Sequence, residues 1–202
     1  METSGTKRAA FGVRMHSGWG VLVAISGDAD SIEVLDRRRI VTADPTVLGA
    51  SQPYHFAAGL GLREAESYLA NCAAVTERLA FEAIKEVVED LRARRCPIAG
   101  SAVLLASGRP LPALPAILAS HALIHTAEGE FFRDAVKKAC ERLGAPVKSI
   151  KERDLDDRAR TAFGNEASRM QRRVSSLGSS IGPPWTKDHK TAALAAAIIL
   201  AT

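Results

Sequence analysis

The chain has 202 residues, of which 47% are apolar and 25% charged, the balance of a soluble globular protein. No Pro/Gly/Ser-rich linker divides it before residues 175–184, so we expect a single domain over residues 1–202. The net charge is +4, and the excess is C-terminal: residues 1–100 carry 12 Lys and Arg against 13 Asp and Glu, and residues 101–202 carry 15 against 10. This excess is compatible with nucleic acid or another polyanion as partner.

Two features predict a cytoplasmic location without membrane contact. The apolar stretch over residues 11–25 is interrupted by Arg14 and His16 and is not followed by a signal-peptide cleavage pattern. The longest apolar run, residues 192–201, is about half of what a bilayer span requires. The cysteines are odd in number and far apart, without a C-x-x-C pair, and are predicted to be small buried residues: Cys72, Cys96 and Cys140.

The N-terminal part predicts three antiparallel strands. Residues 9–16 and 19–26 are rich in strand formers and are separated by a short Ser-Gly turn, which favours a hairpin. Residues 31–44 alternate apolar and polar side chains and end at an Asp-Pro pair, which indicates a third strand. The run Arg37, Arg38 and Arg39 within it is typical of a solvated strand edge.

The middle of the chain predicts a long helix and then a buried strand. We expect residues 46–61 to be irregular and a helix to begin at Leu62, with apolar residues at three- and four-residue spacing. After Pro97, the continuously apolar residues 98–107 are typical of a central strand covered on both faces.

The C-terminal half predicts mainly helices. Short and longer helices are expected at 113–119 and 122–143, and a fifth strand at 147–150. The charge-alternating residues 152–177 are expected to be helical and largely exposed. Thr186 is placed to cap a last helix that runs through the alanine-rich end.

This order of elements resembles the ribonuclease-H-like superfamily, nearest the Holliday-junction resolvase branch. The local likeness lies in the first hairpin, MHSGWG, and in the last helix, TKDHKTAALAAAIIL. The resemblance implies an α/β three-layer fold with a mixed five-stranded sheet, three strands antiparallel and then two parallel, and helices on both faces.

The resemblance also implies two magnesium ions held by acidic residues at three places, and this chain departs at two of them. His16 stands where the first aspartate is expected. The end of the fourth strand offers Ser107 and Arg109 but no carboxylate, and only Asp188, beside His189, matches the third place. Because magnesium prefers oxygen ligands, two-magnesium cleavage is not expected here.

A polar trio on the helix at 122–143 marks the candidate site. His121, His125 and Glu128 fall within an arc of about 60° on one side of that helix, and the same side continues through apolar residues that should face the core. We expect the trio to join His16 and Asp188 at one end of the sheet. The predicted metal ligands are His121, His125, Glu128 and Asp188, and the predicted catalytic residues are His16, His125, Glu128 and Asp188.

Imidazole together with carboxylate suits zinc or manganese better than magnesium as the divalent metal. Other interpretations stay open for the same residues: His121 as a surface or capping residue, His125 as a hydrogen-bonded core histidine, and Glu128 as part of a solvated turn of helix.

Four residues are candidates for binding nucleic acid: Arg109, Trp185, Lys187 and Lys190. Trp185 is placed to stack on a base and the two lysines to meet phosphate, while the alternative is a tryptophan packed under the proline loop. The chain lacks a Walker-type phosphate loop, which excludes nucleotide hydrolysis by that route.

Two functions follow from these residues. The first is a divergent metal-dependent hydrolase acting on nucleic acid or another phosphodiester. The second is a ribonuclease-H-like binding module that has lost catalysis and keeps a nucleic acid or protein partner. The sequence leaves open whether the chain forms a homo-oligomer.

Overall fold

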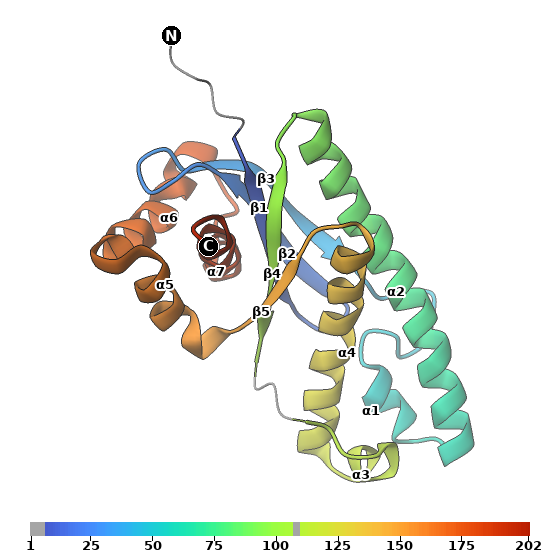
Figure 1. The fold of residues 1–202 in the computed structure, drawn as a ribbon. Helices are drawn as coiled ribbons and strands as arrows, with labels where there is room; N and C mark the ends of the chain where they lie inside the picture. The colour runs from blue at the N-terminus through green and yellow to red at the C-terminus, as the bar shows by residue number, and fades with distance from the viewer. Residues whose placement is uncertain (1–6, 107–109) are drawn as a thin grey trace.

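The computed structural model describes residues 7–106 and 110–202 (Figure 1). Its five-stranded sheet has the order β3-β2-β1-β4-β5. β1 pairs antiparallel with β2 and parallel with β4, β2 pairs antiparallel with β3, and β4 pairs parallel with β5. The strands are β1 (Ala9–Met15), β2 (Trp19–Ser26), β3 (Glu33–Val41), β4 (Ile98–Leu105) and β5 (Val147–Lys151).

Helices cover both faces of this sheet (Figure 1). One face carries α2 and α4, with α1 and α3 beside their far ends, and the other carries α7 with α5 and α6 outside it. The helices are α1 (Pro53–Ala57), α2 (Leu62–Ala93), α3 (Leu114–Leu118), α4 (His121–Arg142), α5 (Leu155–Phe163), α6 (Ala167–Ile181) and α7 (Lys187–Leu200). The strand order and the three layers are those of a ribonuclease-H-like fold, which confirms the predicted fold class.

Alternation along β1 divides the core between the two faces. Phe11 and Val13 pack in the cluster beneath α2 and α4, while Ala10 packs in the cluster beneath α7. Gly12 allows α7 to approach closely, since a Cβ there would lie 2.0 Å from the carbonyl oxygen of Ala192. The last helix therefore rests directly on β1, and residues at the start of α7 are held beside the end of that strand.

Of the predictions for the connecting segments, one needs correction and another needs more detail. The segment 46–61 was expected to be irregular, but it contains the short helix α1, which begins at Pro53 and carries His55. The region 152–177 is helical with most of its residues exposed, as predicted, but its helices are amphipathic. Its apolar residues pack against α7 in the core cluster on that face: Leu155, Ala159, Met170, Val174 and Leu177.

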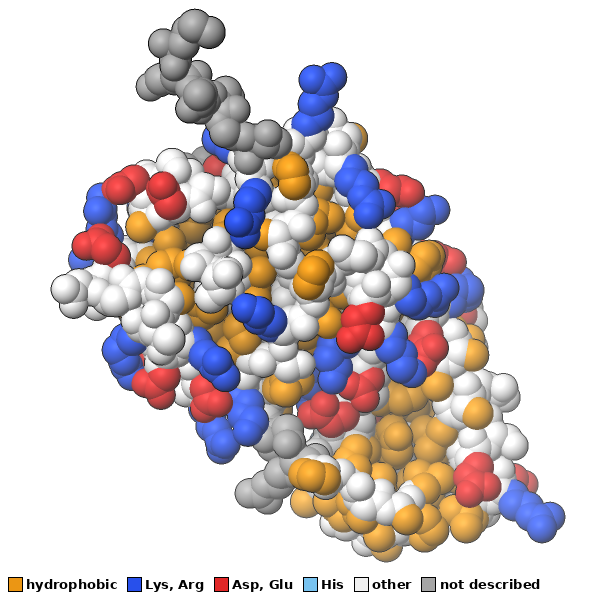
Figure 2. All heavy atoms as spheres, in the orientation of Figure 1, with side chains coloured by type: hydrophobic (Ala, Val, Ile, Leu, Met, Phe, Trp, Pro, Cys, Tyr) orange, Lys and Arg blue, Asp and Glu red, His pale blue; other side chains and the backbone are white. Residues whose placement is uncertain are grey.

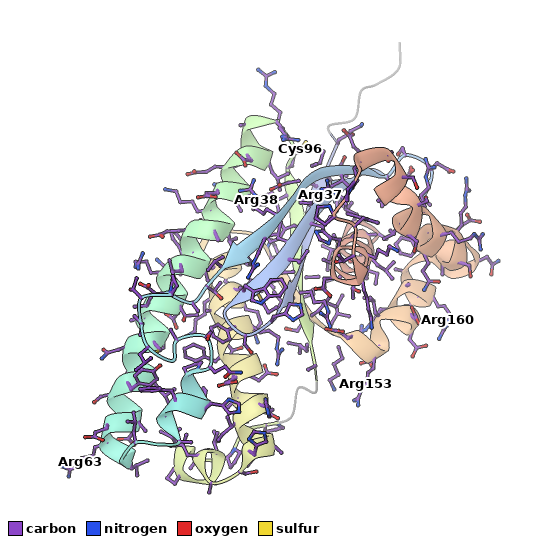
Figure 3. All side chains as sticks on the ribbon, turned by 180° about the vertical axis from the view of Figure 1, so that it is seen from behind. Arg37, Arg38, Arg63, Cys96, Arg153 and Arg160 are labelled. Carbon is purple, nitrogen blue, oxygen red and sulfur yellow. The ribbon has the colours of Figure 1, made fainter. Side chains whose placement is uncertain are left out.

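The arginine run on β3 is also different from the solvated edge that the sequence predicts. Arg37 donates hydrogen bonds to four carbonyl oxygens of residues 181–184 at 2.7–3.1 Å. Arg38 points to the opposite face, where it pairs with Asp90 of α2 at 2.6 Å (Figure 3). Neighbouring arginines on the edge strand thus attach to the two helical layers.

The three cysteines are buried and free, as the sequence predicts: Cys72, Cys96 and Cys140. Burial raises the pKa of the Cys140 thiol to about 11, so it stays a protonated, unreactive core residue at neutral pH. Among the helices of the described residues, none combines the length and apolar character that crossing a membrane requires.

Candidate functional site

A cluster of charged side chains lies where β1 ends and α7 begins. Arg14 places Nη1 2.7 Å from Oδ1 of Asp188, and its Nε and Nη2 lie 2.9 and 3.1 Å from the carboxylate oxygens of Glu152. His16 Nε2 lies 2.9 Å from the other oxygen of Asp188. We call these four residues the Arg14 cluster: Arg14, His16, Glu152 and Asp188.

The start of α7 is fixed by a cap that includes a buried histidine. Thr186 contacts Nδ1 of His189 through both its backbone nitrogen, at 3.3 Å, and its hydroxyl, at 2.8 Å. Burial lowers the pKa of His189, and the nearby charge of Arg37 lowers it further. A neutral imidazole whose Nδ1 accepts from Thr186 fits both facts. This cap sets the position of Asp188 on the first turn.

A stack of three side chains extends from the Arg14 cluster. The ring of His16 lies on Trp19 with centroids 4.2 Å apart and planes 15° from parallel. The guanidinium of Arg39 lies 4.3 Å from the Trp19 centroid. The sequence did not single out Trp19, although its place opposite His16 across a tight turn was a usable signal.

The Arg14 cluster does not fit the magnesium pair that the resemblance implies. Arg14 already supplies a permanent positive charge to both carboxylates, because a guanidinium keeps its proton at any ordinary pH. Its partners are only partly exposed, with 32% of the Glu152 and 21% of the Asp188 side-chain surface accessible. An internal cation therefore takes the place beside Asp188 and Glu152 where a metal ion would have to bind.

A second cluster, formed by histidines, lies between α1 and α4. His55 from α1 and His121 and His125 from the first turns of α4 each offer a ligand nitrogen, and these atoms all lie within 4.8 Å of one another. The Nε2 atoms of His121 and His125 are 3.0 Å apart. The ring centroid of His55 lies 5.3 Å from that of His121 and 4.7 Å from that of His125. We call these three residues the imidazole cluster.

Glu128 lies behind the imidazole cluster and is hydrogen-bonded to one of its histidines, His55. Its side chain is buried, with 2% of the residue exposed, and Oε1 accepts hydrogen bonds from Nδ1 of His55 at 2.7 Å and from the His55 backbone nitrogen at 3.1 Å. The donor set of three imidazoles, with a carboxylate behind one of them, suits a divalent metal that accepts nitrogen ligands.

The predicted site residues thus fall into two groups rather than one. Asp188 and His16 belong to the Arg14 cluster, and among the described residues no hydrogen bond or ion pair links them to His121, His125 or Glu128. The trio also does not face the core as one set: His121 and His125 are exposed, and only Glu128 is buried. The reason is that α4 begins beyond the sheet, beside α1, so its first turn has no strand to pack on (Figure 1).

His55 is the residue that sequence reasoning missed. It lies in a five-residue helix, too short for a periodic pattern, within a segment that reads as irregular. The usable signal was Pro53, because proline is favoured at the first position of a helix, and a histidine follows it two residues later.

The candidates for nucleic-acid binding have different surroundings. Trp185 packs against α6, with its indole nitrogen donating to the carbonyl of Val174 at 2.9 Å and its ring directly over Gly178. Lys187 is exposed and Lys190 is partly exposed, both in the first turn of α7. Arg109 lies outside the described residues.

No family model matches the chain, and no curated protein matches it either. Two solved structures from Thermus thermophilus resemble it. One is RuvC in complex with Holliday junction substrate, with 12% identity, 95% of this chain and 91% of that chain covered, and a TM-score of 0.49. The other is a RuvC structure with 12% identity, 94% and 91% coverage, and a TM-score of 0.48. The fold is ribonuclease-H-like. That assignment rests on the strand order and layers given above.

Proposed function

We propose that this ribonuclease-H-like protein binds nucleic acid or a similar polyanion at the end of β1 without two-magnesium cleavage. The observation that carries the proposal is the position of Arg14 between Asp188 and Glu152. Because the carboxylates are already paired with a guanidinium, they do not require a bound cation, and the region around them is suited to an anionic partner.

The basic side chains around the Arg14 cluster support an anionic partner. Lys187 and Lys190 lie with Asp188 in the first turn of α7, and Lys151 precedes Glu152. Arg39 lies over Trp19, whose ring stacks on His16. Within the part of the chain that the structure describes, none of these four cations forms an ion pair. Unpaired cations beside two carboxylates that already share a guanidinium favour contact with phosphate groups.

The proposal is tested by binding of a fluorescent DNA and a fluorescent RNA at several salt concentrations. We expect the logarithm of the affinity to fall linearly with the logarithm of salt, and Lys187→Glu to weaken binding and reduce that slope by about 1. The control is Arg63→Glu, which makes the same charge change at the start of α2, a helix on the other face of the sheet from α7 (Figure 3). Affinity that is indifferent to salt, or an equal effect of both variants, would refute nucleic-acid binding at this site.

Hydrolysis of a phosphodiester is a second candidate function, favoured by the imidazole cluster. In its metal-dependent form this reaction would not use Asp188, which is already paired with Arg14. His121 and His125 would hold a zinc or manganese ion in the imidazole cluster, and such an ion would lower the pKa of a bound water for attack on the substrate. Its test is turnover of a chromogenic phosphodiester that depends on zinc or manganese and is lost in His125→Ala and in Glu128→Ala.

A further inference from the structure

The imidazole cluster has two features that ordinary surface histidines lack. It combines side chains from two elements that are far apart in the sequence, with residue 55 on α1 and residues 121 and 125 on α4. Its rings also meet edge to face, at interplanar angles of 77°, 67° and 84°, so that their nitrogen atoms converge instead of the rings stacking.

Glu128 selects the tautomer of a neutral His55. An ionised carboxylate only accepts hydrogen bonds, so the 2.7 Å contact places a proton on Nδ1 of His55, and in the neutral ring the lone pair is then on Nε2. A carboxylate that holds the far nitrogen of a histidine in this way is the usual partner of a metal-bound imidazole. The two hydrogen bonds from His55 also compensate for the cost of burying the Glu128 carboxylate.

The spacing of the nitrogens suits a tetrahedral metal. Two nitrogens bound to zinc at 2.0–2.1 Å are about 3.3 Å apart. The Nε2 atoms of His121 and His125 are 3.0 Å apart, and the ligand nitrogens of all three histidines lie within 4.8 Å of one another. A nitrogen at the far limit of this range would have to move about 1.5 Å closer to reach the spacing found around zinc. His121 and His125 have space to rotate because both are exposed.

We propose that His55, His121 and His125 bind one zinc ion, with Glu128 as the residue that positions His55 and with the fourth coordination position open to solvent. Three neutral imidazoles favour zinc over magnesium, which prefers oxygen ligands. A site with three protein ligands and an open position is of the kind that binds water or an anionic oxygen of a substrate. It also ties α1 to the start of α4.

This zinc site is independent of polyanion binding at the Arg14 cluster, and either can fail alone. The test measures zinc content and affinity of the untagged protein after removal of metal and titration with zinc against a competing chelator. We expect one zinc per chain in the wild type. We expect its loss in His125→Ala and in the double variant His121→Ala/His125→Ala, both of which change exposed side chains and keep the fold by circular dichroism.

Two variants separate this site from other histidines and from a purely structural role of Glu128. His16→Ala, in the Arg14 cluster, retains full zinc binding. Glu128→Gln lowers zinc affinity about 10- to 100-fold, the usual effect of removing the outer partner of a metal-bound histidine. Cobalt in place of zinc gives the intense visible absorption of a four-coordinate ion in the wild type and not in His125→Ala.

The proposal is overturned if the folded wild type binds neither zinc nor cobalt at micromolar concentration. It is equally overturned if the double variant binds zinc as tightly as the wild type does, since the ion would then lie elsewhere.

Discussion

At the scale of single residues, Arg14 has the largest effect on what the end of β1 can bind. Its guanidinium contacts carboxylates that lie 138 and 174 residues further along the chain. The sequence indicated Asp188 and His16 at this place, because both follow from the ends of predicted elements. It did not indicate Arg14 or Glu152, because their pairing depends on the register of β1 and β5 across the sheet.

Replacing Arg14 by a carboxylate should convert the cluster into a metal site. Arg14→Asp places three acidic side chains together and removes the hydrogen-bond donor of two partly buried carboxylates, and this loss destabilises the fold by about 1–3 kcal/mol. We expect calorimetric titration to detect manganese or magnesium binding in this variant, and the added ion to restore its thermal stability.

Arg14→Met is the matched control for this change, because it removes the same guanidinium without adding a charge. We expect it to bind manganese much more weakly than Arg14→Asp. If the two variants bind the ion equally well or not at all, Arg14 does not occupy the position of a cation.

At the scale of elements, the first turn of α7 is held by a cap that depends on a neutral histidine. The folded state lowers the pKa of His189, so its contribution to stability is complete above the unfolded pKa of about 6.5. That contribution is lost as the pH falls from there through the lower folded pKa, because the unfolded chain binds the proton more readily.

We therefore expect His189→Gln to flatten the loss of stability between pH 7 and 5. Glutamine at the third helical position after threonine forms an ordinary capping box, so the cap is kept while the titrating group is removed. The measurement is urea denaturation of both proteins at several pH values. If the difference in unfolding free energy between the two proteins is the same at every pH in this range, protonation of His189 is not coupled to folding.

The length of an element decided whether the sequence could predict it. Strands and long helices carry strong periodic patterns, and Leu62 and Thr186 mark the helix starts as predicted. The helix α1 has five residues, too few for a pattern, and its position depends on packing against α2 and α4. The imidazole cluster could therefore be predicted only in part, since two of its histidines lie on a long helix and the third on α1.

At the scale of the whole molecule, the sheet joins two core clusters that no linker separates. β1 contributes Phe11 and Val13 to the cluster under α2 and α4, and Ala10 to the cluster under α7. Hydrophobic side chains gather over the end of the molecule where α1 and α3 lie, while charged side chains are spread among other hydrophobic ones over the rest of the visible face (Figure 2). The shared strand predicts that both halves of the core unfold together.

Two probes report on the two faces separately and so test the expectation of one domain. Trp19 and Trp185 both pack against the α7 cluster, so tryptophan fluorescence follows that face, while circular dichroism is dominated by the long helices α2 and α4 on the other. We expect coincident denaturation curves.

Ile84→Ala and Ile198→Ala, one on each face, should each destabilise the protein by about 2–5 kcal/mol and shift both curves equally. Curves that separate, with each variant shifting only one probe, would divide the chain into two folding units.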